Sequence, residues 1–124
     1  MVKVGVIGCG AWGTTLAKIL VENNHNVQIW CHDAVIENQI NNMQVNSLLP
    51  GIPLSKELQA STDLESVIQN SECIVLAVAS QYISLISKVE NIIEKKPLIC
   101  VVKGLYSDKE NIFISDYISS FYSS

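Results

Sequence analysis

Three glycines near the N-terminus constrain the fold more than any other feature of this chain. They are Gly8, Gly10 and Gly13, in the stretch VIGCGAWGTTLA over residues 6–17. At GxGxxG spacing, the first glycine permits a tight turn out of a strand, the second lets a pyrophosphate approach the backbone, and the third lets a helix pack closely. The apolar residues before the turn predict a strand, and residues 13–22 predict a helix whose N-terminus faces the phosphate. The stretch predicts a dinucleotide site, with a purely structural turn as the alternative.

Composition favours an α/β domain with a buried parallel sheet. The chain has 124 residues, of which 48% are hydrophobic and 16% are charged. Strands covered by helices on both faces have continuous apolar sequences, and residues 73–79 and 98–102 are of this kind. Together with strands at the N-terminus and over residues 27–31, they predict a Rossmann-type, doubly wound and mostly parallel sheet. We expect residues 1–124 to form one NAD(P)-binding domain.

Charge and cysteine usage argue against several other classes. The net charge is −4 and the eight basic residues are scattered lysines, so we expect no nucleic-acid partner. No segment is long and apolar enough to span a membrane and no signal peptide precedes the first strand, which predicts a cytoplasmic protein. Cys9, Cys31, Cys73 and Cys100 have no metal-ligand spacing, which predicts buried reduced thiols and no metal site. Cys9 differs because a helix N-terminus beside it favours its thiolate.

The strand over residues 27–31 ends at His32 and Asp33, where this type of fold meets the adenosine ribose. Asp33 lies 20 residues after Gly13, so its carboxylate can accept a hydrogen bond from a ribose 2′-OH and favour NAD. Alternatively, Asp33 caps the next helix. His32 can stack on adenine or, when protonated, attract a 2′-phosphate. The choice between NAD and NADP stays open.

Residues 34–68 connect that strand to the next buried one. Apolar residues at helical spacing predict a helix over residues 34–43. Two prolines and a glycine mark residues 44–56 as a long connection, and such loops inside compact domains are usually functional or packed. A short strand over residues 58–61 and a brief helix through Ile68, capped by the threonine or aspartate before it, complete the segment.

Two later strands end in residues that face the same crevice as the glycine turn. The strand over residues 73–79 is followed by Tyr82, which can lie against a nicotinamide ring or make the first core contact of the next helix. The strand over residues 98–102 is followed by Lys103 and Gly104. A lysine at this edge can hold an anionic substrate or polarise a carbonyl, and the alternative is a solvated charge.

Five motifs follow one another along residues 2–122: GCGAWGTTLA, IWCHD, NSLLPGIPLS, an alanine-serine step before an aromatic residue, and VVKGL. This succession resembles the bacterial NAD(P)-dependent glycerol-3-phosphate dehydrogenases, and it covers the N-terminal, cofactor-binding domain of that family. The resemblance implies reversible hydride transfer between the nicotinamide and C2 of glycerol 3-phosphate, which gives dihydroxyacetone phosphate. It also implies a role in the synthesis of glycerophospholipid precursors.

The same resemblance assigns roles to individual residues. It implies that Ala11 and Trp12 contact the dinucleotide from the glycine turn and that His32 lies by the adenosine end. It implies that Tyr82 lies near the nicotinamide. Lys103 matches the lysine that touches both the cofactor and glycerol 3-phosphate, which makes it the candidate catalytic residue of this chain.

Two features depart from the family pattern. Ala79 stands where the family usually has proline. The family's proton-transferring lysine and most of its phosphate-binding residues belong to a second, helical domain, which we expect to be absent from this chain. We therefore expect the chain alone to bind dinucleotide but to turn over slowly or not at all. Two other interpretations stay open, namely another two-domain Rossmann dehydrogenase and a non-catalytic dinucleotide-binding module, and the sequence leaves open whether the chain forms a homo-oligomer.

Overall fold

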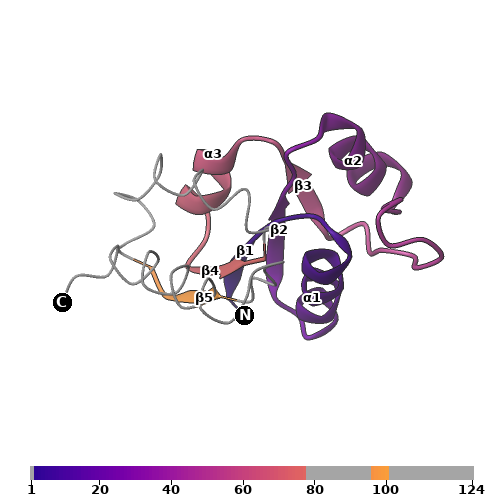
Figure 1. The fold of residues 1–124 in the computed structure, drawn as a ribbon. Helices are drawn as coiled ribbons and strands as arrows, with labels where there is room; N and C mark the ends of the chain where they lie inside the picture. The colour runs from indigo at the N-terminus through magenta and orange to yellow at the C-terminus, as the bar shows by residue number, and fades with distance from the viewer. Residues whose placement is uncertain (1, 78–95, 101–124) are drawn as a thin grey trace, which may run out of the picture.

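A five-stranded parallel sheet lies at the centre of the part of the chain that the computed structural model describes, residues 2–77 and 96–100 (Figure 1). The strand order is β3-β2-β1-β4-β5, and every neighbouring pair is parallel. The chain runs from β1 outward to β3 and then crosses back to β4, which is the doubly wound arrangement that the sequence predicts. The elements are β1 (Lys3–Ile7), α1 (Ala11–Glu22), β2 (Asn26–Trp30), α2 (Ala34–Asn38), η1 (Gln39–Met43), β3 (Gln59–Ser61), α3 (Leu64–Gln69), β4 (Cys73–Leu76) and β5 (Leu98–Cys100).

The two faces of the sheet carry different helices because side chains alternate along each strand. Val4 and Val6 of β1 lie in the same buried cluster as Ala17 of α1. On the other face, a Cβ at Gly5 would lie 3.2 Å from the side chain of Val67 in α3. Figure 1 shows α1 and α3 on opposite sides of the sheet. Coverage of β1 on both faces explains its continuous apolar sequence.

The long connection between η1 and β3 is packed against the rest of the domain. Leu54 and Leu58 are buried in the same cluster as Ile40 of η1. Complete burial of such a side chain stabilises the fold by about 1.5–3 kcal/mol. The backbone N–H of Leu54 also donates to the carbonyl oxygen of Gln44 at 2.9 Å. The connection is thus a packed loop whose position relative to the sheet is fixed.

Asn41 of η1 forms hydrogen bonds with the backbone at the outer edge of β3. Its carboxamide donates to the carbonyl oxygen of Ala60 at 2.9 Å and accepts from the N–H of Ala60 at 2.8 Å. β3 is an edge strand of the described sheet, and unpaired backbone groups at an edge invite pairing with another chain. The side chain of Asn41 takes the place of a neighbouring strand at this residue.

One predicted helix boundary is wrong, and one predicted helix is divided in two. α1 begins at Ala11, two residues before the predicted start, because the N–H of Thr14 already donates to the carbonyl oxygen of Gly10 at 3.0 Å. The helix predicted over residues 34–43 is divided into α2 and the π-helical turn η1. Val35 and Met43, two apolar positions of that predicted helix, are exposed rather than buried in the core.

The predicted strand over residues 73–79 also differs, because β4 ends at Leu76. The N–H of Ala77 donates to the carbonyl oxygen of Ile7 at 2.8 Å, and beyond Ile7 the neighbouring strand turns away at Gly8. On the β1 side the pairing therefore ends here, and residue 79 lies outside the described residues. The helix cap predicted at a threonine or aspartate is confirmed at Asp63, whose side chain accepts from the N–H of Ser66.

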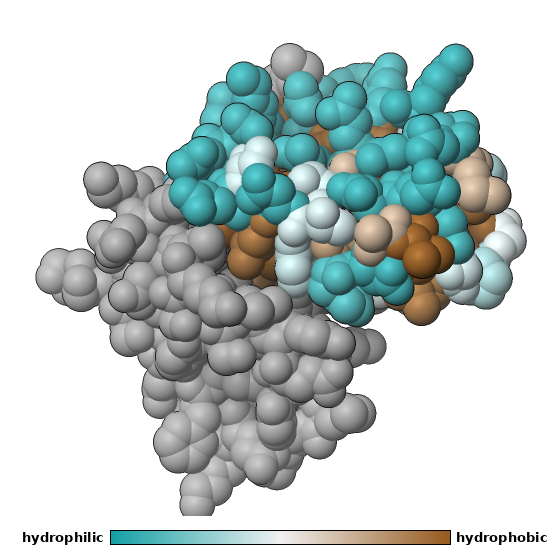
Figure 2. Space-filling model, turned by 90° about the horizontal axis from the view of Figure 1, so that it is seen from above, coloured by the Kyte–Doolittle hydropathy of each residue, from teal (hydrophilic) through white to brown (hydrophobic). Residues whose placement is uncertain are grey.

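The surface seen in Figure 2 is mostly hydrophilic over the described residues, with apolar side chains in small groups. Within the described part of the chain, no helix combines the length and the apolar character that crossing a bilayer requires. The exposed large apolar side chains among these residues are Trp12, Ile19, Val35, Met43, Val45, Leu48 and Ile52.

Candidate functional site

The turn between β1 and α1 contains three glycines in three different environments. Gly8 has a φ of +126°, which residues with a Cβ rarely adopt. A Cβ at Gly13 would collide with the carbonyl oxygen of Gly8 and would lie 3.3 Å from the Cβ of Ala77. Gly10 is exposed, and a Cβ there would meet no described atom within 4 Å. The turn therefore has the geometry that its glycine spacing predicts, with open space at the second glycine.

The N-terminus of α1 has features that suit an anion. Gly10 is the N-cap residue, so no side chain caps this end, and no acidic residue lies in the first turn. A helix N-terminus carries a partial positive charge from its backbone N–H groups. Gly10 and Ala11 are both exposed, so a ligand can reach the helix end from solvent. A pyrophosphate fits this position because it is anionic and needs close access to the backbone.

Two buried polar residues hold the turn from the side of the core. The hydroxyl of Thr14 donates to the carbonyl oxygen of Cys9 at 3.1 Å. Nδ2 of Asn46 donates to that same oxygen and to Oγ1 of Thr14, both at 2.8 Å. Oδ1 of Asn46 accepts from the N–H of Leu48 at 2.9 Å, so both ends of the carboxamide are used. The long connection is thereby fastened to the glycine turn.

Asn46 is a positioning residue that the sequence interpretation missed. It begins the NSLLPG motif, which belongs to the family resemblance, but a polar residue in a loop gave no sign of burial. The structure shows Asn46 only 2% exposed and Thr14 fully buried. Leaving a buried polar group without its partner costs about 1–3 kcal/mol, so these two side chains stabilise the conformation of the turn.

Two thiols lie in the core beneath the turn. Cys9 and Cys31 belong to one buried cluster and are only 2% and 0% exposed. The hydrogen bond from Cys31 lowers the pKa of the Cys9 thiol, and the backbone N–H of His32 adds to this effect. The same sulfur–sulfur hydrogen bond, followed by burial, raises the pKa of Cys31. The lowered pKa agrees in direction with the thiolate preference predicted for Cys9, and its largest cause is the neighbouring Cys31 thiol.

The carboxyl end of β2 places His32 and Asp33 beside the glycine turn, where the N–H of Gly8 donates to the carbonyl oxygen of Trp30 at 3.2 Å. Asp33 caps α2, since its Oδ1 accepts from the N–H of Val35 at 2.8 Å, and the capping interpretation is confirmed. A ribose contact of Asp33 stays a prediction. His32 is exposed, and its ring centroid lies 6.3 Å from that of Trp30 with 49° between the ring planes.

The described residues bring most of the predicted site together. Ala11 and Trp12 lie in the first turn of α1, and the Trp12 side chain is 48% exposed. Tyr82 and Lys103 lie outside the described residues, so their roles stay predictions. No group of three or more His, Cys, Asp or Glu side chains within the described part of the chain could hold a metal ion. The predicted residues gathered at the carboxyl end of the sheet are Gly8, Gly10, Ala11, Trp12, Gly13, His32 and Asp33.

A parallel sheet in this order, with a glycine turn after its first strand and an uncapped helix after the turn, defines the Rossmann fold that nucleotide-dependent dehydrogenases use. The family model described as the NAD-dependent glycerol-3-phosphate dehydrogenase N-terminus matches residues 3–124. The chain belongs to this family.

Individual relatives agree with the family match. The glycerol-3-phosphate dehydrogenase (NAD(P)+) of Agathobacter rectalis is 32% identical over 126 residues, covering 97% of this chain and 36% of the relative. The enzyme of the same name from Bacillus licheniformis is 38% identical over 111 residues, covering 87% of this chain and 32% of the relative. The solved structure of glycerol-3-phosphate dehydrogenase from Saccharomyces cerevisiae matches with a TM-score of 0.82 at 29% identity, covering 97% of this chain and 39% of that one. The chain spans about a third of the length of these curated relatives.

Proposed function

We propose that this chain binds NAD(H) or NADP(H) at the glycine turn and is the cofactor-binding part of a glycerol-3-phosphate dehydrogenase. The observation that carries the proposal is the open space at Gly10, directly before an uncapped helix N-terminus. The buried hydrogen bonds of Thr14 and Asn46 support it, because they fix the backbone that would meet the pyrophosphate. The curated relatives are named for this reaction and for both cofactors.

Each described residue of the site has a distinct part in binding. A bound nicotinamide dinucleotide supplies the hydride that the reaction transfers. Gly8 and Gly13 set the shape of the turn, and the helix after Gly10 receives the pyrophosphate. His32 contacts the adenosine end. Asp33 accepts a hydrogen bond from the ribose with the carboxylate oxygen that does not cap α2.

The substrate and two further residues enter the proposal through the family. Glycerol 3-phosphate and dihydroxyacetone phosphate are the proposed substrate pair. Tyr82 lies near the nicotinamide in this proposal, and Lys103 holds cofactor and substrate with its positive charge near the reacting oxygen. A cytoplasmic location and a role in the synthesis of glycerophospholipid precursors stay predictions.

Calorimetric titration with NADH and NADPH tests the proposal on the wild type, Gly10→Asp and Gln59→Glu. Gly10→Asp puts a carboxylate into the open space of the turn, so we expect no measurable binding of either cofactor. Gln59→Glu adds one negative charge at the amino end of the edge strand β3, so we expect a Kd within about twofold of the wild type because exposed distant charges are screened. Equal loss of affinity in both variants, or a folded wild type that binds neither cofactor, would contradict the proposal.

His32→Ala tests the adenosine end of the same site. If His32 attracts a 2′-phosphate, the variant loses affinity for NADPH and keeps its affinity for NADH. Equal weakening for both cofactors indicates stacking on the adenine ring. Unchanged titrations for both would remove His32 from the site.

A further inference from the structure

We propose that Cys9 and Cys31 are a redox-modification site, in which oxidation by a peroxide joins the two sulfurs in a disulfide that distorts the glycine turn. The effect of this disulfide on cofactor affinity rests on the proposed function. Formation of the disulfide itself does not.

The fold brings the two sulfurs together from neighbouring strands. β1 and β2 pair in parallel with Ile7 opposite Trp30, and the N–H of Gly8 donates to the carbonyl oxygen of Trp30. Cys9 and Cys31 follow directly after these pairs and lie in one buried cluster, and each thiol shifts the pKa of the other. Both are free thiols.

The two thiols are chemically unequal, which is what stepwise oxidation requires. The neighbouring Cys31 thiol and the backbone N–H of His32 lower the pKa of Cys9, whereas the pKa of Cys31 is raised, and we therefore assign Cys9 as the thiol that reacts first. The thiolate is the nucleophilic form of cysteine. Cys31 keeps its proton and lies beside Cys9 in the position of a resolving thiol.

The oxidation balances with one equivalent of hydrogen peroxide. The Cys9 thiolate attacks one peroxide oxygen, the O–O bond breaks, and the departing hydroxide takes a proton to leave as water, so Cys9 becomes a sulfenic acid. The Cys31 sulfur then attacks the Cys9 sulfur, the S–O bond breaks, and the hydroxide takes the Cys31 proton to form a second water. Two thiols are oxidised to one disulfide while the peroxide is reduced to two waters. Cys9 is only 2% exposed and adjoins the exposed Gly10, so the proposed oxidation takes place when the turn opens at Gly10.

A disulfide at this position changes the backbone that the dinucleotide needs. Its S–S bond is about 2.05 Å long, much shorter than the separation of two sulfurs that are not bonded, so Cys9 and Cys31 must move toward each other. The carbonyl oxygen of Cys9 accepts from both Thr14 and Asn46, and movement of Cys9 is therefore transmitted to the start of α1. In the oxidised chain, Gly10 no longer has the position that it has in the reduced chain.

The test treats the folded, reduced 124-residue chain with hydrogen peroxide, unfolds it in denaturant so that buried thiols become accessible, blocks the remaining thiols by alkylation, and maps the products by mass spectrometry. We expect a loss of two hydrogens located in a Cys9–Cys31 disulfide. We also expect faster amide hydrogen exchange over residues 8–14 and about tenfold or greater weakening of NADH binding, which is a loss of about 1.4 kcal/mol. Dithiothreitol should restore both properties.

Two variants sharpen the test. Cys31→Ser removes the resolving thiol and should leave Cys9 as a sulfenic acid, seen as an added oxygen rather than a disulfide. Cys73→Ser, in β4 and away from the turn, should behave as the wild type. If Cys31→Ser folds poorly, Cys31→Ala serves the same purpose. Direct mapping of the wild type depends on neither variant.

Three outcomes overturn the proposal. They are that both thiols of the peroxide-treated wild type can still be alkylated in denaturant, that the disulfide links another pair of cysteines, or that the Cys9–Cys31 disulfide forms without changing amide exchange in the turn. Failure of the proposed function gives a different result, because the reduced chain then binds no NADH. In that case mass mapping and amide exchange still decide whether the disulfide forms and distorts the turn.

Discussion

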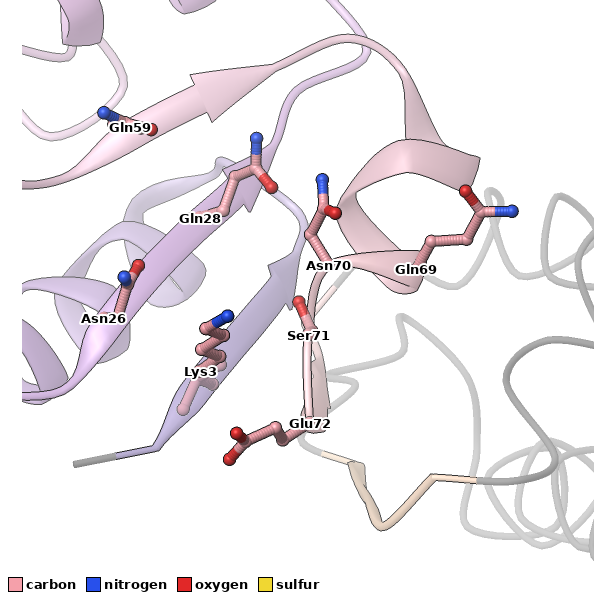
Figure 3. A pocket seen from close by; sticks show the side chains of 9 residues that line it. Lys3, Asn26, Gln28, Gln59, Gln69, Asn70, Ser71 and Glu72 are labelled. Carbon is pink, nitrogen blue, oxygen red and sulfur yellow. The ribbon is translucent and has the colours of Figure 1, made fainter.

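The two ends of the parallel sheet differ in how their polar groups are held. At the carboxyl end, the glycine turn is fixed by buried hydrogen bonds and leaves open space at one backbone position. At the amino end, polar side chains line a hollow of about 460 Å³ (Figure 3). The lining residues are Lys3, Val4, Asn26, Gln28, Gln59, Gln69, Asn70, Ser71 and Glu72, and most of them are exposed.

The hollow offers volume but little preorganisation. Figure 3 shows Lys3 and Gln28 on neighbouring strands, with Asn70 and Ser71 across from them at the end of α3. Within the described residues, no hydrogen bond holds the side chain of Lys3 or Gln28. Ordering such a side chain on a ligand costs about 0.5–1.5 kcal/mol each. We therefore expect the glycine turn at the carboxyl end to be the better binding site, because buried hydrogen bonds hold its backbone in place.

The largest expected effect follows from a methyl group in the glycine turn. Gly13→Ala should destabilise the fold by about 3 kcal/mol, because its Cβ would collide with the carbonyl oxygen of Gly8. Helix propensity alone would make alanine more stable than glycine here by up to about 1 kcal/mol. A loss of stability therefore indicates the steric clash, and a gain indicates that helix propensity dominates. Urea denaturation measures the change. Gly10→Ala is the matched control and should stay within about 0.5 kcal/mol, since its Cβ meets open space.

Asn46→Ala should have the second largest effect, a loss of about 2 kcal/mol in the free energy of unfolding. The variant removes a buried carboxamide that donates to the carbonyl oxygen of Cys9 and to Thr14. NADH affinity should fall as well, because the turn loses its support. Asn42→Ala, an exposed neighbour in η1, provides the control with an expected change within about 0.5 kcal/mol. Equal effects of the two variants would show that burial of Asn46 is unimportant.

Lys96→Met should cost about 1 kcal/mol of stability without changing NADH affinity. The Lys96 ammonium donates to the carbonyl oxygens of Ile68, Gln69 and Ser71 at the end of α3, and methionine keeps the apolar stem while removing these bonds. Denaturation and calorimetry together separate stability from binding. A large loss of cofactor affinity would show that the two ends of the sheet are coupled.

The smallest effect is expected in the hollow itself. Gln28→Ala should change stability by less than about 0.5 kcal/mol and leave the titrations with NADH and NADPH unaltered. Its carboxamide has no hydrogen-bond partner among the described residues. Weaker cofactor binding by this variant would indicate that the cofactor binds at the amino end of the sheet, contrary to our assignment.

Sequence patterns predicted the strand, turn and helix at the N-terminus because the backbone conformation and packing of the turn require glycine at fixed positions. Gly8 needs a positive φ and Gly13 needs close packing, and neither depends on residues far along the chain for its signal. The parallel sheet was predictable for a similar reason, since strands covered on both faces have continuous apolar sequences.

Features that depend on distant partners were not predictable in this way. Asn46 is buried because it reaches Cys9, 37 residues earlier, and its own neighbourhood reads as a polar loop. The division of the helix over residues 34–43 follows a π-helical turn that hydrophobic spacing does not reveal. The placement of Cys9 and Cys31 at the ends of neighbouring strands depends on the register of those strands, which the spacing of the cysteines alone does not give.

A residue-resolved amide NMR titration of the isotope-labelled chain with NADH tests most directly which end of the sheet binds the cofactor. We predict that the amides of Gly10, Ala11 and Gly13 shift with a common saturation curve. The amides of Asn26 and Gln59, at the amino end, should stay in place. Shifts confined to the amino end, or saturation without change in the glycine turn, would contradict the assignment of the site.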